Sequence, residues 1–356
     1  MKPIAVVTGS SGLIGSEVAR RLARDHTVVG FDITEPPAHA PIDLSLYMDV
    51  TADMSVRDVV DRILLEYGRR IAAVVHLSAY YDFSGKASPR YRQVTVEGTR
   101  RILEELRRKD VDVERFIFAS TMLVHAPVRP GERLDEESPL DPRWAYPQSK
   151  LETERVICQA RGGYPATMLR IAGVYTDRGR QPTLVHQIKR IHGQDFNSFF
   201  FPGDSEAGQS LVHLDCAVDA IVRTVERRRN LPDEVAILIG EPDPVSYAEL
   251  QDLIGERLWG DEWPTLRVPE PMAKAGAWIQ DKVPGSDGFI KPYMIELADD
   301  HYALDISRAR ELLGWAPRRS LRDVLPRILD DLLEDPARWY RRNDLEPPGR
   351  VARSFD

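Results

Sequence analysis

The chain has 356 residues, of which 42% are hydrophobic and 29% are charged, and its formal net charge at pH 7 is −8. This composition is that of an ordinary globular protein, and the length exceeds the roughly 100–200 residues of one average domain. Basic and acidic residues are interspersed, so no nucleic-acid partner is expected. Two cysteines without metal-ligand spacing predict neither a disulfide framework nor a metal site. The sequence shows no signal segment and no long apolar run, which predicts a cytoplasmic protein without membrane contact.

Strand-like and helix-like patterns alternate through the first half of the chain. Residues 4–8 (IAVVT) have the apolar pattern of a buried strand, residues 13–24 that of a helix, and residues 27–31 that of a second strand. This alternation predicts βαβ units, and therefore an α/β protein with a Rossmann-type, doubly wound parallel sheet. Further strands are predicted at 71–78, 115–120 and 166–171, with helices within 88–109 and at about 148–161.

The alternation ends after residue 172, where proline, glycine and aromatic residues become frequent, as in FNSFFFPGDSEAG (196–208). One more strand is predicted at 234–240, and most of the later sequence has helical patterns. We therefore expect three parts: an NAD-binding core of residues 1–172 and 206–242, a smaller and mostly helical substrate-binding lobe of residues 173–205 and 243–340, and a polar tail of residues 341–356.

A glycine-rich segment, TGSSGLIG (8–15), joins the first predicted strand to the first predicted helix. Gly9 would allow a tight turn, Gly12 would let the backbone approach a pyrophosphate, and Gly15 would let the helix pack close to the strand. The start of that helix offers N–H groups and the positive end of a dipole to phosphates. Asp32 ends the second strand and would accept the ribose hydroxyls of NAD while repelling the 2′-phosphate of NADP.

Tyr146 and Lys150 are four residues apart, so on a helix both project from one face. Thr121 follows a predicted strand and should lie at the carboxyl edge of the sheet, where open α/β folds bind ligands. A phenol has an ordinary pKa of about 10, but a neighbouring ammonium favours the phenolate and permits proton exchange with a substrate oxygen. Pro147 disfavours helical geometry at Tyr146 and so predicts a helix start or kink there.

Together these motifs resemble the extended short-chain dehydrogenase/reductase superfamily, which includes the NAD-dependent epimerases and dehydratases and hydroxysteroid-type dehydrogenases. The matching segments occur in the family's order and span most of the chain. They are TGSSGLIG (8–15), DV (49–50), HLSA (76–79), VEGT (96–99), FIFAST (116–121), YPQSK (146–150), LRIAGVY (169–175), LVHLD (211–215) and ISRARELLGWAP (306–317).

The resemblance implies an NAD-dependent enzyme in which Thr121 and Tyr146 bind the reacting oxygen and Lys150 also holds the nicotinamide ribose. It further implies that Asp49 and Val50 contact adenine. The predicted cofactor-binding residues are Gly9, Ser11, Gly12, Leu13, Ile14, Gly15, Asp32, Asp49, Val50, Leu77, Ser78, Ala79, Ser120, Tyr146 and Lys150. The predicted substrate contacts are Tyr80, Tyr81, Met122, Gly173 and Gln209.

Departures from the family pattern bear on the substrate. Nucleotide-sugar epimerases usually have Asn at the position of Gly173 and commonly have Arg at that of Gln209, where it neutralises a diphosphate. The 4,6-dehydratases follow the catalytic Thr with Asp-Glu, whereas this chain has Met122 and Leu123. In motif detail the sequence is closer to hydroxysteroid dehydrogenases and flavonol reductases. The first reading is therefore net oxidation or reduction of a small apolar hydroxyl or ketone substrate.

Two alternatives remain open. A nucleotide-sugar epimerase could recognise phosphate through Arg178, Arg180 or Lys189. A non-catalytic NAD(P)-sensing regulator is more remote, because a sensor does not need the set of Thr121, Tyr146 and Lys150.

A homodimer is also possible. In the family, helices corresponding to about 88–109 and 148–161 form a dimer interface. Val94, Ile102, Leu103 and Leu106 fit either such an interface or a core within one chain.

Overall fold

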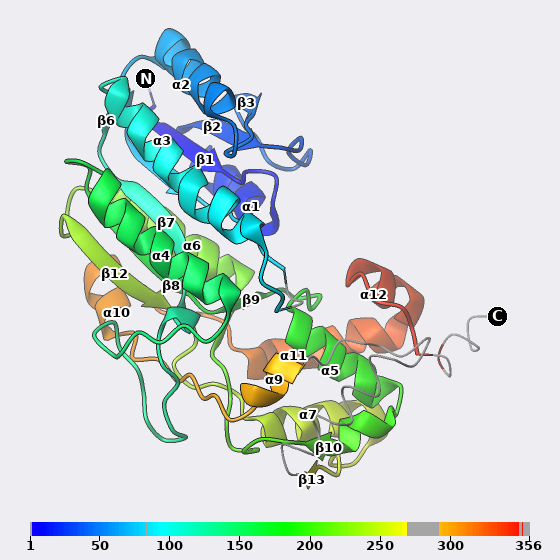
Figure 1. Cartoon of the computed structure of the whole chain (residues 1–356). Helices are drawn as coiled ribbons and strands as arrows, with labels where there is room; N and C mark the ends of the chain where they lie inside the picture. The colour runs from blue at the N-terminus through cyan, green and yellow to red at the C-terminus, as the bar shows by residue number, and fades with distance from the viewer. Residues whose placement is uncertain (1, 83–84, 269–291, 349–350, 352–356) are drawn as a thin grey trace.

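The computed structural model describes residues 2–82, 85–268, 292–348 and 351. Its centre is a seven-stranded sheet in the order β12-β8-β7-β5-β1-β2-β3, and all the strand pairs are parallel (Figure 1). This confirms the predicted Rossmann-type sheet. The strands are β1 (Ile4–Thr8), β2 (Thr27–Asp32), β3 (Leu44–Tyr47), β5 (Ala73–His76), β7 (Phe116–Thr121), β8 (Ala166–Ile171) and β12 (Glu234–Ile239).

Helices cover both faces of the sheet. One face carries α1 (Leu13–Leu22), α6 (Leu214–Glu226) and α10 (Ser307–Leu313), and the other carries α2 (Asp53–Tyr67), α3 (Glu97–Arg108) and α4 (Ala145–Ala160). Buried apolar side chains form a separate cluster on each face. This double covering explains why the strand sequences are continuously apolar and do not alternate.

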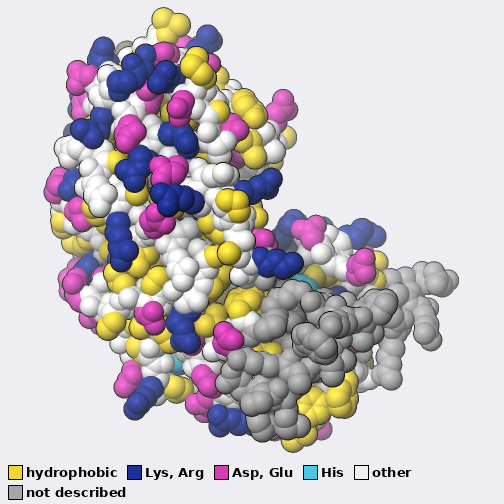
Figure 2. Space-filling model, viewed as in Figure 1, with side chains coloured by type: hydrophobic (Ala, Val, Ile, Leu, Met, Phe, Trp, Pro, Cys, Tyr) yellow, Lys and Arg dark blue, Asp and Glu magenta, His cyan; other side chains and the backbone are white. Residues whose placement is uncertain are grey.

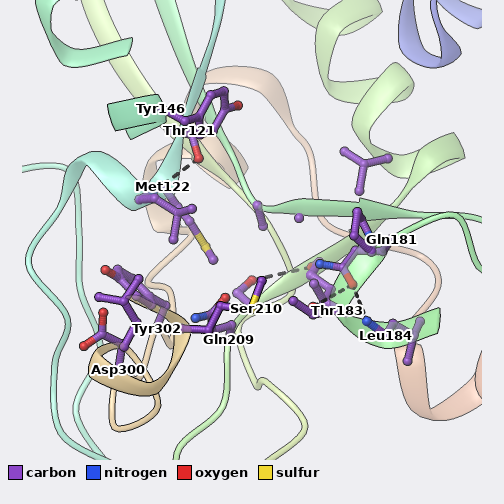
Figure 3. A pocket seen from close by; sticks show the side chains of 18 of the residues that line it. Thr121, Met122, Tyr146, Gln181, Thr183, Leu184, Gln209, Ser210, Asp300 and Tyr302 are labelled. Carbon is purple, nitrogen blue, oxygen red and sulfur yellow. Dashed lines mark hydrogen bonds between the residues drawn. The ribbon is translucent and has the colours of Figure 1, made fainter. Parts of the chain in front are cut away.

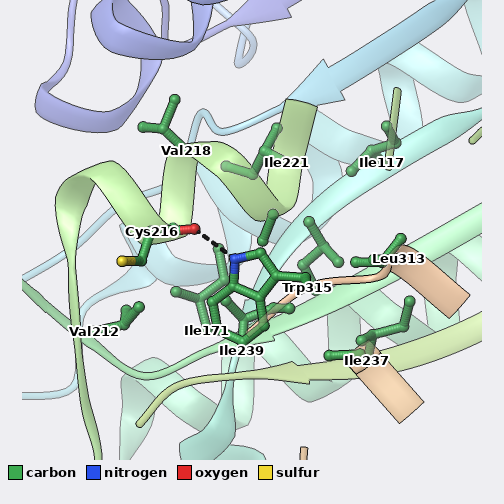
Figure 4. Packing of buried hydrophobic residues seen from close by; sticks show 14 of the residues in the cluster. Ile117, Ile171, Val212, Cys216, Val218, Ile221, Ile237, Ile239, Leu313 and Trp315 are labelled. Atoms are coloured by element: carbon green, nitrogen blue, oxygen red, sulfur yellow. Dashed lines mark hydrogen bonds between the residues drawn. The ribbon is translucent and has the colours of Figure 1, made fainter. Parts of the chain in front are cut away.

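Trp315 ties the later sequence to the first of these clusters. The indole lies between α6 and the sheet strands, and its N–H donates a 2.9 Å hydrogen bond to the carbonyl of Cys216 (Figure 4). Since a buried indole N–H needs an acceptor, this bond lets a large aromatic side chain fill the core without leaving a polar group unpaired. Residues after 300 therefore complete the same core as β1 and α1.

A smaller helical part lies beside the carboxyl end of the sheet (Figure 1). It has its own apolar cluster, in which Trp263, Trp339 and Tyr340 are buried. Asn343, from the predicted polar tail, accepts a 2.8 Å hydrogen bond from the amide of Arg180. The helices here are α5 (Pro182–His192), α7 (Tyr247–Trp259), α9 (Pro292–Glu296), α11 (Leu321–Glu334) and α12 (Pro336–Arg342).

Short strand pairs and single turns complete the described residues. A π-helical turn, η1 (Tyr91–Val96), leads into α3, and 3-10 turns η2 (Met122–Val124) and η3 (Phe196–Phe199) follow. The strand pairs are β9 (Gly173–Tyr175) with β11 (Leu211–His213), β10 (Phe200–Phe201) with β13 (Leu266–Arg267), and β4 (Arg70–Ile71) with β6 (Asp112–Val113).

The structure differs from the predicted elements in places that have simple causes. Neither β3 nor α2 was predicted, because β3 is a half-buried edge strand and α2 buries only four side chains. The predicted helix start or kink at Tyr146 is a start, since α4 begins at Ala145. Pro147 is tolerated because it occupies the first turn, where its missing N–H has no helical acceptor.

The apolar stripe on α3 packs within this chain. Ile102, Leu103 and Leu106 are buried in the apolar cluster between the sheet and helices α2, α3 and α4, and Val94 packs against this cluster. Over the outer face of α2, α3 and α4, basic and acidic side chains are interspersed (Figure 2). The stripe is thus explained without a partner, and a dimer stays a prediction. Among the described helices, none has the length and apolar character needed to cross a lipid bilayer.

Candidate functional site

The glycine-rich segment forms a tight loop between β1 and α1. Gly9 has a φ of +70°, and its amide donates a 2.8 Å hydrogen bond to the carbonyl of Phe31. A Cβ on Gly15 would lie 2.0 Å from the carbonyl oxygen of Gly9, so only glycine lets α1 approach the loop this closely. A Cβ on Gly12 would meet no protein atom closer than 3.4 Å. Gly12 therefore leaves open the space in front of α1, into which its first N–H groups point.

Asp32, at the end of β2, is fixed by this loop. Its Oδ2 accepts a 2.9 Å hydrogen bond from the amide of Ser11, and its Oδ1 accepts one of 2.7 Å from the amide of Ile33. Ser11 in turn donates through its hydroxyl to the carbonyl of Thr34 at 2.7 Å. Oδ1 also accepts longer hydrogen bonds from the amide and the hydroxyl of Thr34, at 3.3 and 3.4 Å, whereas Oδ2 has one recorded bond and keeps an acceptor position for a ribose hydroxyl. The loop and the carboxylate thus fit the adenosine end of a dinucleotide.

Tyr146 and Thr121 lie side by side at the carboxyl edge of the sheet (Figure 3). Tyr146 comes from the first turn of α4, and Thr121 is the last residue of β7. Lys150, one turn further along α4, is buried, and its ammonium donates a 2.7 Å hydrogen bond to the carbonyl of Ala119. The structure therefore brings together the three residues that the sequence assigned to catalysis.

The pKa values of the pair correct one expectation. Burial raises the pKa of Tyr146 to about 12, although a hydrogen bond with the Thr121 side chain opposes this. Burial also lowers the pKa of Lys150 to about 7, against the opposing influence of the Glu154 carboxylate. The ammonium is 5.8 Å from the centre of the Tyr146 ring. We expected the ammonium to favour the phenolate, whereas burial raises the pKa of the phenol and so opposes this effect.

A buried polar network supports the strand that carries Thr121. Ser120 donates a 2.5 Å hydrogen bond to Glu154, and Arg170 holds both oxygens of that carboxylate at 3.2 and 2.8 Å. Arg170 also contacts the ring of His125 at 3.0 Å. Burial lowers the pKa of His125 to about 4, so this ring is neutral and structural.

One large cavity, of about 790 Å³, joins the glycine loop to the smaller helical part. Its walls come from both parts of the molecule, and Tyr146 is one of the residues that line it. The sequence-predicted residues that line it are Gly9, Gly12, Leu13, Ile14, Gly15, Leu77, Ala79, Tyr81, Ser120, Thr121, Met122, Tyr146, Lys150, Gly173 and Gln209.

Other predicted residues lie outside the cavity wall. Tyr80 is a correction, because its ring packs edge-on against Tyr91 at 4.9 Å and does not reach the cavity. Val50 is buried in the core and packs against Gly98. A Cβ added to Gly98 would lie 2.8 Å from the Val50 side chain. Four more predicted residues lie outside the wall. Ser11 and Asp32 form the loop contacts described above. Asp49 accepts a 2.8 Å hydrogen bond from the amide of Thr51, and the amide of Ser78 donates one of 3.2 Å to the Thr8 hydroxyl.

The cations that the sequence suggested for phosphate recognition do not line the cavity. Arg178 and Arg180 are exposed on a loop, and Arg180 pairs with Asp344. Lys189 is buried and does not line the cavity. The charged residues that do line it are Arg143, Lys150, Arg190 and Asp300.

Arg190 is the cation that the sequence reasoning missed by one position. On α5 the cavity wall includes Thr183, Gln187 and Arg190, a spacing of four and then three residues that marks one helix face. Lys189, one residue earlier, points about 100° away from that face. Helical periodicity within PTLVHQIKRIH (182–192) was therefore the signal that could have distinguished the two.

Aromatic side chains occupy two places on the cavity wall. Near the reacting end, Trp144 lies 5.4 Å and Tyr81 4.9 Å from the ring of Tyr146. Beyond Arg190, Phe201 and Tyr247 are stacked with an interplanar angle of 10°. Phe201 belongs to the aromatic segment 196–208, whose role the sequence left open, and it lines the cavity.

Comparisons with known proteins agree with this geometry. A family model described as "NAD dependent epimerase/dehydratase family" matches residues 5–240. A dTDP-glucose 4,6-dehydratase of Streptomyces niveus is 31% identical over 358 residues, covering 95% of this chain and 93% of that protein. A Bacillus subtilis protein named "Uncharacterized UDP-glucose epimerase YtcB" is 24% identical, covering 90% and 95%.

The solved structures show the same fold. The UDP-glucuronic acid 4-epimerase from Bacillus cereus, in complex with UDP-glucuronic acid and NAD, superposes with a TM-score of 0.67 at 20% identity. The match covers 93% of this chain and 99% of that chain.

Proposed function

Because this chain belongs to the NAD dependent epimerase/dehydratase family, we propose that it acts on a nucleotide-linked sugar, transiently oxidising one hydroxyl with bound NAD as an epimerase does. The relatives support this alternative better than the first reading of the sequence, net oxidation or reduction of an apolar alcohol or ketone. The cavity supports it too, because it carries two arginines that the sequence reasoning did not place there.

The cofactor would lie along the glycine loop. Gly12 and the first amides of α1 would face the pyrophosphate, and Asp32 would accept the adenosine ribose hydroxyls. Lys150 would hold the nicotinamide ribose. When bound, NAD supplies a hydride acceptor and returns the hydride to the same substrate.

The chain's own groups would handle the proton. Tyr146 and Thr121 would hold the reacting oxygen of the substrate. The Tyr146 phenolate would accept the hydroxyl proton as the hydride leaves, and the resulting phenol would return that proton to the ketone oxygen as the hydride comes back. Met122 and Leu123 carry no acid or base, so no elimination of water of the 4,6-dehydratase kind is proposed. Epimerisation needs proton and hydride transfer at one carbon, with the hydride returned to the opposite face of the carbonyl, so the keto sugar would have to turn in the cavity. It needs no further acid or base.

Arg190 is the observation that carries the nucleotide-sugar assignment. It is half-buried and lines the cavity, and its buried Nε has no hydrogen-bond partner among the described residues. No ion pair engages it within the same residues. A buried N–H without an acceptor is costly, and a diphosphate would satisfy this guanidinium with charge-assisted hydrogen bonds. The stacked pair of Phe201 and Tyr247 lies next to it and offers an aromatic surface to a nucleobase.

Calorimetry on the NAD-loaded protein tests this proposal. Free UDP, dTDP and GDP would be titrated into the wild type, Arg190→Ala and a control, Arg180→Ala, whose side chain is exposed and paired with Asp344. We expect at least one nucleotide to bind the wild type and the control equally, and to bind Arg190→Ala about a hundredfold more weakly, which is about 2.8 kcal/mol. Absence of binding by all three nucleotides would overturn the proposal.

The first reading keeps one observation in its favour. The wall around Tyr146 is aromatic, with Trp144 and Tyr81 against the reactive ring, and Gly173 presents no side chain to a sugar. An apolar ring would fit such a wall. Net conversion of free NAD to NADH by an aryl or alicyclic alcohol, without any nucleotide requirement, would restore this candidate.

A further inference from the structure

In addition to Arg190, the cavity wall contains an ion pair between Arg143 and Asp300. Arg143 precedes α4, and Asp300 comes from the segment that follows α9, 157 residues later. The Nη1 of Arg143 donates a 3.2 Å hydrogen bond to Oδ1 of Asp300. Both residues line the cavity. Neither was singled out by the sequence motifs.

The two partners are unequally buried. The Asp300 side chain is 6% exposed, whereas that of Arg143 is 38% exposed. A carboxylate this buried needs a partner, and Asp300 ties the Nη1 end of the guanidinium to the cavity wall. Among the described residues, Asp300 provides the only side-chain or backbone acceptor recorded for Arg143. Because a guanidinium has five N–H donors, several remain for a ligand in the cavity.

The position of Arg143 and Asp300 relative to Tyr146 determines which part of a substrate could reach them. Arg143 is three residues before Tyr146, and Asp300 is two residues before Tyr302, which pairs with Gln209. In Figure 3, Thr121 and Tyr146 lie on one side of Met122, and Asp300, Tyr302 and Gln209 lie on the other.

Arg190 lies at the other end of α5, about 10 Å along the helix from Thr183 at a rise of 1.5 Å per residue. Arg143 is the neighbour of Trp144, whose ring lies 5.4 Å from that of Tyr146, and this places Arg143 near the reacting end of the cavity. It would meet a substituent of the sugar ring and not the diphosphate.

We propose that Arg143, oriented by Asp300, is a subsite for a carboxylate carried by the sugar ring, so that the substrate is a nucleotide-linked uronic acid. This rests on the proposed function. A planar guanidinium binds a carboxylate through two parallel hydrogen bonds, whereas a hydroxymethyl group offers one neutral acceptor. The negative charge of Asp300 would repel any anion bound to Arg143. It would repel a dianionic phosphate more strongly than a singly charged carboxylate.

The test compares two probes that differ only at this substituent. UDP-glucuronic acid and UDP-glucose are titrated by calorimetry into the full-length, NAD-loaded wild type and into Arg143→Gln. We expect the wild type to bind the uronate at least about tenfold more tightly. In Arg143→Gln the uronate should lose about tenfold or more in affinity, while UDP-glucose changes by less than about threefold, so that the preference disappears.

Further variants keep the test independent of folding. Arg133→Gln is the matched control, because Arg133 pairs with Asp243 on the exposed surface. It should leave the ratio of the two affinities unchanged. Arg143→Lys keeps the charge but not the paired donors, so it should retain only part of the preference. Thermal melting of each variant, compared with the wild type, confirms that the fold is intact.

The outcomes separate the two proposals. Binding of both probes by the wild type with equal affinity, or an unchanged ratio in Arg143→Gln, overturns the uronate subsite and leaves the nucleotide-sugar assignment standing. Failure of both probes to bind below millimolar concentration overturns the subsite, and it counts against the proposed function only where free UDP, dTDP and GDP also fail to bind.

Discussion

Lys150 reaches from α4 to β7, where its ammonium donates a 2.7 Å hydrogen bond to the carbonyl of Ala119. The same helix contacts the two following residues of the strand, through Glu154 at Ser120 and Tyr146 at Thr121. Three α4 side chains, each one turn apart, thus hold three consecutive residues of β7. The reacting groups are fixed to the sheet before any ligand arrives, which is the arrangement that precise proton transfer requires.

Replacing Tyr146 by Phe should cut turnover by about a hundredfold or more, since general acid–base groups typically contribute on this scale. The phenol does not hold the helix to the strand by itself, so NAD affinity should stay nearly unchanged. Steady-state rates and NAD titration of the same preparation check this. Lys150→Ala is the informative companion, because it should impair both quantities. Full turnover in Tyr146→Phe would remove this chemistry from the protein.

Asp32→Asn should weaken discrimination against NADP. The amide keeps an oxygen for the Ser11 N–H and loses the negative charge, but it also loses the acceptor of the Ile33 N–H, so the melting temperature is recorded beside the affinities. We expect the wild type to prefer NAD by about a hundredfold, or about 2.8 kcal/mol, and the variant to bind the two cofactors within about tenfold. Fluorescence titration with both cofactors measures the ratio. Equal affinities in the wild type would refute the role given to Asp32.

Two glycine substitutions in one loop should act differently. Gly12→Ala places its Cβ in van der Waals contact with the Gly9 carbonyl oxygen, at 3.4 Å and without a clash, so the melting temperature should hardly change while NAD affinity falls about tenfold or more. Gly15→Ala places its Cβ 2.0 Å from the Gly9 carbonyl, so α1 must move and stability should fall too. Calorimetric melting with and without NAD distinguishes these effects. A Gly12→Ala variant with wild-type NAD affinity contradicts the proposed pyrophosphate position.

Stability should depend on pH through Glu241. This buried carboxyl accepts hydrogen bonds from the Tyr175 hydroxyl and the Leu321 amide, both at 2.9 Å. Burial raises its pKa from 4.5 to about 7, against the opposing pull of those bonds and of Arg322. The folded protein therefore binds this proton more tightly than the unfolded chain. The resulting stabilisation is complete below pH 4.5 and is lost as the pH rises through 7.

The measurement compares the wild type with Glu241→Gln in urea at several pH values. Between pH 4.5 and 8 the wild type should lose up to about 3 kcal/mol of unfolding free energy that the glutamine variant does not lose. Parallel pH profiles for the two proteins would show that Glu241 does not titrate in this range.

The sheet and its glycine loop could be predicted because their signals are local. Continuous apolar runs define β1, β7 and β8, and glycine spacing defines the loop that follows β1. The relation of Tyr146 to Lys150 could be predicted from helical periodicity. These features depend on residues that are close together in the chain, and each of them is present in the structure.

The cavity's charges could not be predicted in this way. Arg143 and Asp300 meet only because the segment after α9 returns to the sheet edge, and Arg190 reaches the cavity because of how α5 is rotated. The sequence selected Arg178 and Arg180 instead, which are basic and near the site in the chain but exposed on a loop. The pKa of Tyr146 was expected to fall because of its neighbour Lys150, but burial, which depends on the whole fold, raises it.

The central claim is that NAD is used transiently and the hydride returns to the substrate that gave it. The most direct test supplies a UDP-sugar, such as UDP-glucuronic acid, with deuterium on the reacting carbon, together with excess free unlabelled NAD, and analyses the products by mass spectrometry and NMR. The account predicts an epimer that retains its deuterium, with free NADH absent from solution. Deuterium recovered in free NADH, with a ketone as the accumulating product, would contradict it and identify a net dehydrogenase.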